Sequence, residues 1–181
     1  MNLASLIKQK KYEKVVFLFR RHPITFIPIL ALFLVLMSVP AALYFLISSI
    51  FPDFINNPIF YPLAVLLASV YYLSIYLFFY AMFVDYYLDL WIVTNDRIVD
   101  IEQNGLFSRT ISELDLFRIQ DVTTEVHGFF STLFRYGDLH VKTASANINI
   151  VFRNIPNPNK AREALIVMAD EDRRFHYNED K

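Results

Sequence analysis

A long stretch with almost no charged residues places the strongest limit on how this chain can fold. Between Ile24 and Val84 the sequence runs for 61 residues with a single formally charged side chain, Asp53, near the middle. An apolar helix needs about 20 residues to cross the hydrocarbon core of a bilayer, which is about 30 Å thick. The apolar runs on both sides of Asp53 are longer than that. The sequence therefore predicts two membrane-spanning helices, at about 24–50 and 59–84, joined by a tight turn.

The unequal distribution of basic residues predicts how these helices are oriented. Residues 1–22 carry six Lys and Arg against one Glu, whereas the turn around Asp53 carries no Lys or Arg. Because basic residues close to a span are retained on the cytoplasmic side, we expect a multi-pass protein of the cell membrane with both termini in the cytoplasm. The residues expected at the membrane interface are the N-terminal bases and the aromatic residues that follow the second helix, namely Lys8, Lys10, Lys11, Lys14, Arg20, Arg21, Tyr86, Tyr87 and Trp91.

An apolar run, Val15–Phe19, stands directly before Arg20 and Arg21 in the N-terminal segment. Basic head groups next to apolar side chains suit a stretch that lies in the lipid interface, so residues 1–22 are expected to form a basic interfacial segment. The other interpretation is that these bases only flank the first span. The interior of neither span carries an ionisable side chain, which gives no support to a transport function.

After Asp89 the pattern changes to short runs rich in β-branched and aromatic residues, which is typical of strands. In the run Leu139–Thr143, apolar side chains alternate with His140 and Lys142, so one face of that strand is expected to be buried. Asn104-Gly105 predicts a type I′ hairpin turn. The expected strands are Trp91–Thr94, Arg97–Gln103, Leu106–Leu116, Ile119–Val126, Leu139–Thr143 and Asn147–Phe152.

The period of the pattern changes again at Asn157, which can cap a helix that starts with Pro158. Ala161 and Leu165 then lie on one apolar stripe. Residues 171–181 are expected to form a charged tail, because acidic residues near a helix C-terminus oppose the helix dipole.

Together these patterns predict the fold class, an α+β membrane protein. A transmembrane helical hairpin over residues 23–88 is followed, over residues 89–170, by six to seven antiparallel strands and one C-terminal helix. Strands of this number closed by one helix are the order of a barrel of the pleckstrin-homology (PH) type.

Several short segments carry a more specific likeness. They are Arg20–Pro23, Val93–Ile98, Gly105–Arg109, Arg118–Val122 and Tyr136–Leu139. In this order, and over about residues 12–170, the sequence resembles the membrane-flanked bacterial PH domain family, also called DUF304, with its YdbS- and YdbT-like proteins. The resemblance implies the fold and the membrane topology. It implies no enzymatic activity, cofactor or catalytic residue.

The resemblance also raises the question of lipid headgroups, since phosphoinositide-binding PH domains use clustered Lys and Arg around the first hairpin loop. The turn expected to correspond is Asn95–Arg97, and residues 85–181 carry sixteen Asp and Glu against eleven Lys and Arg. On these charges neither a phosphoinositide headgroup nor nucleic acid is an expected partner.

The segment Phe129–Phe134 is unusually apolar for a connection between strands. Phe129 with Leu133, and Phe130 with Phe134, have the i, i+4 spacing of a short helix with two apolar faces. We expect most of these side chains to pack into the barrel core. A contact role for Phe130 or Phe134, towards the membrane, the N-terminal segment or a second subunit, is the alternative.

The sequence lacks the combinations of residues that enzymes need. It has no cysteine and only four dispersed histidines, with no glycine-rich phosphate loop or paired metal ligands. No catalytic, cofactor-binding or metal-binding residue is therefore expected. The sequence predicts a non-enzymatic, membrane-anchored interaction or scaffold module, whose partner is a protein or a second copy. The alternative is a lipid-sensing or envelope-stress protein that contacts anionic lipids of the bilayer.

Overall fold

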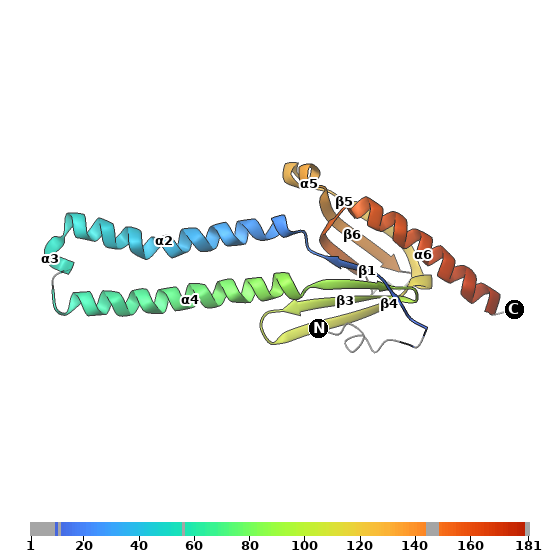
Figure 1. Cartoon of the computed structure of the whole chain (residues 1–181), viewed down its shortest axis with the longest axis horizontal. Helices are drawn as coiled ribbons and strands as arrows, with labels where there is room; N and C mark the ends of the chain where they lie inside the picture. The colour runs from blue at the N-terminus through green and yellow to red at the C-terminus, as the bar shows by residue number, and fades with distance from the viewer. Residues whose placement is uncertain (1–9, 11, 56, 144–148, 180–181) are drawn as a thin grey trace. The chain divides into compact units, whose positions relative to one another are not determined.

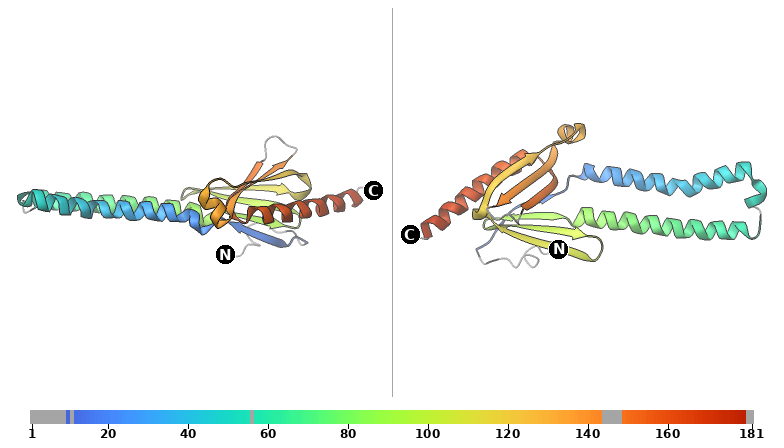
Figure 2. Two further views of the ribbon diagram at one scale, coloured as in Figure 1. Left: turned by 90° about the horizontal axis from the view of Figure 1, so that it is seen from above. Right: turned by 180° about the vertical axis from the view of Figure 1, so that it is seen from behind.

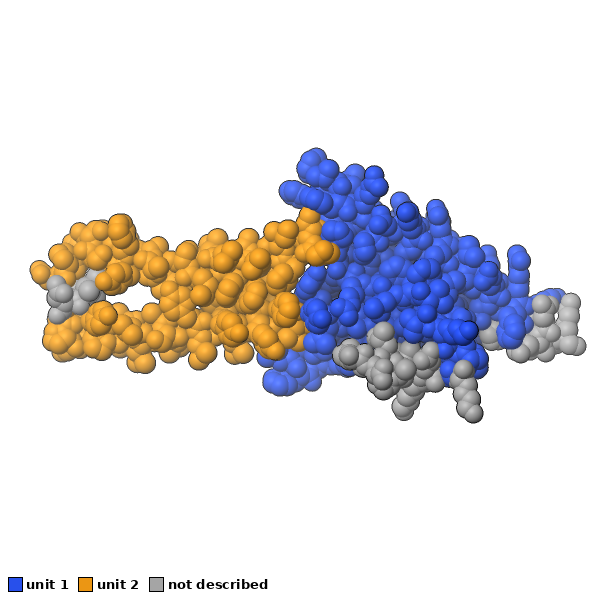
Figure 3. Space-filling model, viewed as in Figure 1, with its two compact units in different colours: residues 1–22, 85–181 blue, residues 23–84 orange. Residues whose placement is uncertain are grey.

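The structure is a computed structural model that describes residues 10, 12–55, 57–143 and 149–179. It divides into two compact units (Figure 3). The helical unit comprises residues 23–84, and the strand-rich unit comprises residues 1–22 together with 85–181. The strand-rich unit is thus assembled from both sides of the apolar helices, and its expected start at residue 89 is wrong.

The helical unit contains two helices that are long and apolar enough to cross a membrane. Their ranges are Pro23–Ile50, with 28 residues and a mean hydropathy of 2.5, and Phe60–Leu88, with 29 residues and a mean hydropathy of 1.9. The elements in chain order are the 3-10 helix η1 (Pro23–Phe26), α2 (Ile27–Ile50), the short α3 (Pro52–Ile55) and α4 (Phe60–Leu88). The expected pair of long helices is present, and Asp53 lies in the short helix between them.

The two long helices contact each other through aromatic side chains. Phe33 and Phe79 stack with ring centroids 4.1 Å apart. Pro40 lies inside α2, and because proline has no N–H, the carbonyl of Leu36 lacks its donor four residues on. The hydroxyl of Tyr71 donates to that carbonyl over 3.0 Å. The second helix therefore satisfies a backbone acceptor that the first cannot satisfy itself.

Beyond Pro40 the helices leave an apolar opening of about 400 Å³ (Figure 3). Ala64 and Ala68 line it. These small residues therefore border a gap, although their spacing in the sequence suits close packing of helices.

The strand-rich unit holds seven strands among the described residues, arranged in two antiparallel sheets (Figure 1). The first sheet has the order β1-β2-β3-β4 and the second the order β5-β6-β7. The bounds are β1 Val15–Arg20, β2 Leu90–Thr94, β3 Arg97–Asn104, β4 Ser108–Asp115, β5 Ile119–Glu125, β6 Tyr136–Thr143 and β7 Asn149–Pro156. The 3-10 helix η2 (Leu116–Arg118), α5 (Phe129–Phe134) and α6 (Pro158–Glu179) complete the unit.

Strand β1 is the main departure from the sequence expectation. Val15–Arg20 pairs with β2, with Phe19 opposite Trp91 and Arg20 opposite Leu90. The segment expected in the lipid interface is therefore the first strand of the sheet. Its β-branched and aromatic side chains favour a strand, and β2 offers an equally apolar partner. The whole helical unit is consequently the connection between β1 and β2.

The core lies between the two sheets and under α6, which runs along the second sheet (Figure 2). Trp91 is only 3% exposed and stacks on Phe152, with ring centroids 5.5 Å apart. Its expected place in an interfacial aromatic belt is wrong, because it points inward from β2. Leu139 and Val141 are fully buried, as their alternation predicted.

Two of the differences from the predicted boundaries have a clear physical cause. β3 and β4 are joined by the three-residue loop 105–107, with Gly105 at φ 71°, so the two-residue type I′ turn is wrong. Helix α6 continues to Glu179 and does not end near residue 170. The carboxylate of Asp172 accepts the N–H of Phe117 at 3.0 Å, and Arg173 donates to the carbonyl of Ile119 at 2.7 Å. These tertiary contacts stabilise the last turns of α6, where the acidic residues oppose the helix dipole.

Candidate functional site

The two ends of the strand-rich unit differ in how the chain passes through them. β1 ends at Arg20 directly opposite Leu90, where β2 begins. The chain thus leaves the unit towards the apolar helices and returns at one place, which we name the attachment end. The turn at Asn95–Asp96, between β2 and β3, lies at the opposite end, which we name the far end.

A buried carboxylate fastens the two connections at the attachment end. Arg21 forms an ion pair with Asp89, which is 2% exposed. The other carboxylate oxygen accepts the N–H of Gln103 at 2.7 Å. Burial raises the pKa of Asp89, while the hydrogen bond from Gln103 and the charge of Arg21 act against the rise. The hydroxyl of Tyr86 also reaches the carbonyl of Arg21, at 3.5 Å. The three contacts join the end of β1 to the start of β2 and to the end of β3.

Arg20 lies at the same end but remains exposed. Its guanidinium lies 5.3 Å from the ring centroid of Tyr87, within range of a cation–π contact. Four of the nine residues expected at the interface are therefore found at the attachment end: Arg20, Arg21, Tyr86 and Tyr87.

The lysines of the N-terminal segment lie elsewhere. Lys10 pairs with Asp96 at 2.5 Å, and the backbone N–H of Lys14 donates to the side chain of Asn95 at 2.6 Å. Both lysines are therefore at the far end, which contradicts their expected place beside the first span. Lys8 and Lys11 lie outside the described residues.

A buried ion pair holds this N-terminal segment to the sheet. Arg97 on β3 donates to the two carboxylate oxygens of Glu13 at 2.9 and 3.0 Å, and to Glu113 on β4 at 2.6 Å. Burial alone would raise the pKa of Glu13, but hydrogen bonds from Arg97 and from the backbone of Lys10 lower it. The carboxylate thus stays charged and fixes the start of β1.

The loop between β3 and β4 projects at the attachment end. Ile101 pairs with Leu90, and β3 continues three residues beyond it to Asn104. The loop therefore lies past the point where the chain enters β2. Its last residue, Phe107, is 99% exposed.

Helix α5 also lies at this end. It immediately precedes β6, and the ring of Tyr136 stacks on His22 with centroids 5.4 Å apart. The expectation that its side chains pack into the core is wrong, because Ser131 is the buried residue of this fully described helix. The exposed fractions are 76% for Phe129, 64% for Phe130, 58% for Leu133 and 43% for Phe134.

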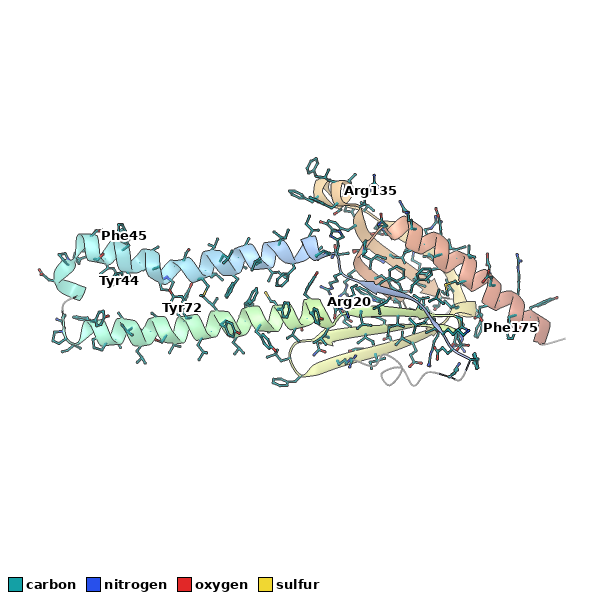
Figure 4. All side chains as sticks on the ribbon, in the orientation of Figure 1. Arg20, Tyr44, Phe45, Tyr72, Arg135 and Phe175 are labelled. Carbon is teal, nitrogen blue, oxygen red and sulfur yellow. The ribbon has the colours of Figure 1, made fainter. Side chains whose placement is uncertain are left out.

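The local backbone explains why α5 stands away from the barrel. It begins after Gly128, with φ 99°, and ends at Arg135 in the left-handed conformation, with φ 55°. At Gly137 a Cβ atom would lie only 2.5 Å from the carbonyl oxygen of Glu125, so β5 and β6 approach too closely for a side chain there. The helix is confined to the end of the hairpin, and figures 1 and 4 show it projecting there.

A small polar cavity of about 90 Å³ lies beside the first sheet. Asp89, Asp100 and Glu102 line it, with Arg153 opposite. Burial, together with the charges of Glu102 and Asp89, raises the pKa of Asp100 to about 6. Arg153 pairs with Glu102 at 2.8 Å. Within the described residues, no group of three or more His, Asp or Glu is arranged to hold a metal ion.

Comparison with known proteins places this architecture in a family. The sequence profile described as "Bacterial PH domain" matches residues 22–168, well over half of the chain. The chain belongs to the bacterial PH domain family. The resemblance found from short segments is thereby confirmed, and β1 adds to the domain a strand that lies before the matched residues.

Among solved structures, the chain is similar to the crystal structure of a DUF1696 family protein with a pleckstrin-homology domain from Shewanella loihica PV-4. The identity is 14% and the TM-score 0.37, over 45% of this chain and 70% of that chain. No curated protein matches.

The strand order shows which turn lies between the first strands of the sheet. The first hairpin of this bacterial PH domain is β1–β2, and the turn at Asn95–Arg97 joins β2 to β3. The connection between β1 and β2 therefore contains the two apolar helices.

Proposed function

We propose that this bacterial PH domain protein is a non-enzymatic interaction module anchored in the cell membrane, with its strand-rich unit on the cytoplasmic side. One observation carries the proposal: two apolar helices of membrane-spanning length form the connection between neighbouring strands of the domain. The domain is thus attached to its anchor at two adjacent points.

The surface of the helical unit supports a lipid environment. Phe45, Leu66 and Leu73 are each at least 60% exposed, and a soluble protein does not leave such a continuous apolar surface in water. The Tyr71 hydrogen bond to Leu36 also suits a bilayer, where a free backbone carbonyl is costly.

The sequence supports the orientation. Two spans return the chain to the side from which it started, which agrees with both connections meeting at one end of the strand-rich unit. Arg20 and Arg21 stand on that side, and the residues from Phe51 to Ile59 contain no Lys or Arg.

A doubly tethered domain is suited to presenting one surface to a partner. Tethering restricts its rotation and raises the effective concentration of whatever binds it at the membrane. The first sheet ends in β4, which has a described neighbour on one side, and residues 108–111 are exposed. An open strand edge of this kind accepts an added strand from a protein partner or a second copy.

Direct sensing of anionic lipid by the N-terminal bases is less well supported. Lys10 and Lys14 lie at the far end, and Arg21 is paired with Asp89. Arg20 remains as the exposed N-terminal arginine at the attachment end.

Single-cysteine labelling tests the anchoring and the orientation, because the chain contains no native cysteine. In intact cells, a membrane-impermeant maleimide should label Asp53→Cys, and it should label Glu163→Cys on α6 only after lysis. Labelling of Glu163→Cys in intact cells would overturn the orientation.

The partner surface is tested with Thr110→Lys combined with Ser112→Lys, which places two charges on β4. Association of the detergent-purified protein with itself or with a captured partner should fall at least tenfold, measured by light scattering and co-purification. Glu163→Lys with Val167→Lys on the exposed side of α6 is the matched control. Equal association of both variants would exclude the β4 edge.

A further inference from the structure

We propose that the attachment end of the bacterial PH domain docks on the surface of the phospholipid bilayer through two apolar projections. The first is the loop 105–107 with Phe107 at its tip, and the second is α5 with Phe129, Phe130 and Leu133. This inference rests on the proposed anchoring of the apolar helices in a membrane, and it assigns a lipid contact to the strand-rich unit itself.

The first projection is an aromatic side chain that has no packing role in the domain. Phe107 is 99% exposed at the tip of a tight loop, so its ring contributes almost nothing to the core. The segment 103–109 contains Arg109 and no Asp or Glu. An aromatic ring beside a lone arginine suits the headgroup region, where the ring inserts and the guanidinium meets lipid phosphate.

The second projection repeats this composition on the other sheet. Phe129 and Phe130 are mostly exposed and contact each other edge to face, with centroids 5.6 Å apart. Between Gly128 and Arg135 there is no Asp or Glu, and the segment ends in the exposed Arg135 (Figure 4). The nearest acid before it, Glu125, lies beside His127 at 3.3 Å.

The position of both projections indicates that the surface they contact is the bilayer. Phe107 lies beyond the start of β2, and α5 lies beside His22, so both are at the end from which the chain enters the apolar helices. A domain anchored there meets the lipid surface with this end first. The two segments carry only Arg as charge, whereas residues 85–181 as a whole carry sixteen acidic against eleven basic residues. The two segments therefore add no negative charge that anionic lipid would repel.

Docking at these points would fix the orientation of the domain on the membrane. The helical connections supply one contact, and the loop 105–107 and α5 supply two more from separate sheets. Three separated contacts prevent rocking, so the edge of β4 is presented in a constant direction.

The test places an environment-sensitive fluorophore on single cysteines in the full-length protein, reconstituted in nanodiscs of phosphatidylcholine and phosphatidylglycerol. The labelled positions are Phe107→Cys, Phe130→Cys, Leu66→Cys within α4, and Phe175→Cys. Phe175 is the matched aromatic control, because it is 61% exposed near the end of α6 (Figure 4). The neighbouring Asp172 accepts the N–H of Phe117, which follows the end of β4, and β4 ends opposite Arg97 at the far end. Nitroxide-bearing lipids then report the depth of each fluorophore by quenching.

The expected result is deep quenching at Leu66, shallow quenching at Phe107 and Phe130, and at least threefold weaker quenching at Phe175. Water-like emission at Phe107 and Phe130, with deep quenching at Leu66, would overturn the docking and leave the anchoring intact. A blue shift at Phe107 and Phe130 without quenching by lipid would also overturn it, because a second copy would then cover these rings. Water-like emission at Leu66 would overturn the proposed anchoring itself.

A second variant keeps the test independent of the fluorophore's own apolar character. In the background of Phe107→Asp with Phe130→Asp, quenching at Leu133→Cys should fall at least threefold, while Phe175→Asp should leave it unchanged. The thermal midpoint of the domain should be retained, because both replaced rings are exposed. Unchanged quenching in the double variant would contradict the docking.

Discussion

Strand β1 and helix α5 are two short apolar segments of the same domain with opposite structural roles. β1 is paired with β2 along its length, and Phe19 packs on Phe152 with ring centroids 5.7 Å apart. α5 contributes Ser131 to the buried part of the domain and leaves its aromatic rings exposed. The difference shows that the backbone partner decides where an apolar run lies, since β1 has a strand edge to join and α5 is held at the tip of a hairpin.

The largest effect is expected from the ion pair that fixes the start of β1. Glu13→Ala leaves Arg97 without its buried partner, although Glu113 remains within reach. We expect a loss of about 2–4 kcal/mol in the free energy of unfolding. Denaturant unfolding of the purified protein measures it. The exposed Arg153 and Glu102 pair supplies the control, since Glu102→Ala should cost well under half as much.

A smaller loss is expected when β1 keeps its backbone pairing but loses its inward ring. Phe19→Ala should lower the free energy of unfolding by about 2 kcal/mol, because the ring is partly buried against Phe152 and Phe17. A change below about 0.5 kcal/mol would mean that β1 adds little to the core.

Asp100, which lines the small polar cavity, should make the free energy of unfolding depend on pH. The expected change is similar to or smaller than that of Phe19→Ala. The folded state raises the pKa of Asp100 from its ordinary 3.8 to about 6, so charging this group opposes folding as pH rises between these values. Asp100→Asn should therefore stabilise the domain by about 1–2 kcal/mol at pH 8, the carboxyl being partly solvated. The gain should vanish at pH 4. Unfolding curves at both pH values check this, and an equal gain at both would exclude titration of Asp100 as its cause.

In the helical unit, one substitution removes a hydrogen bond to a backbone carbonyl and keeps the aromatic ring that carried the donor. Tyr71→Phe deletes the hydroxyl that donates to the carbonyl of Leu36. We expect a loss of about 1 kcal/mol in helix–helix stability, measured by steric trapping or by unfolding in mild detergent. Tyr76→Phe, at an exposed position of α4, is the control.

The smallest effect on stability is expected at α5. Phe130→Ala should change the free energy of unfolding by less than about 0.5 kcal/mol, because its ring is 64% exposed. Comparing this loss with the loss for Phe19→Ala tests most directly whether β1 and α5 differ in their structural roles. A loss at Phe130 as large as that at Phe19 would show that α5 has a structural role in the domain.

Much of the fold follows from local patterns in the sequence. Alternation identified the buried face of β6, and Asn157-Pro158 located the start of α6. The 61-residue stretch with one charge predicted the two long helices.

The remaining features depend on contacts between distant residues. β1 pairs with β2 across the whole helical unit, so predicting Val15–Arg20 as a strand requires a partner strand that lies 70 to 79 positions later. The two valines and two phenylalanines of this segment were the available signal. The same limit applies to Trp91, whose burial depends on Phe152, and to α5, whose exposure depends on how closely β5 and β6 approach at Gly137.

Hydrogen exchange of the β1 amides tests the central claim most directly, that the helical unit is inserted within one domain. In the full-length protein in nanodiscs, the amides of Val15–Arg20 that pair with β2 should exchange as slowly as their partners in Leu90–Thr94. Glu13→Ala should speed the exchange of β1. Exchange of Val15–Arg20 at the rate of an unstructured chain, with β2 still protected, would contradict the account.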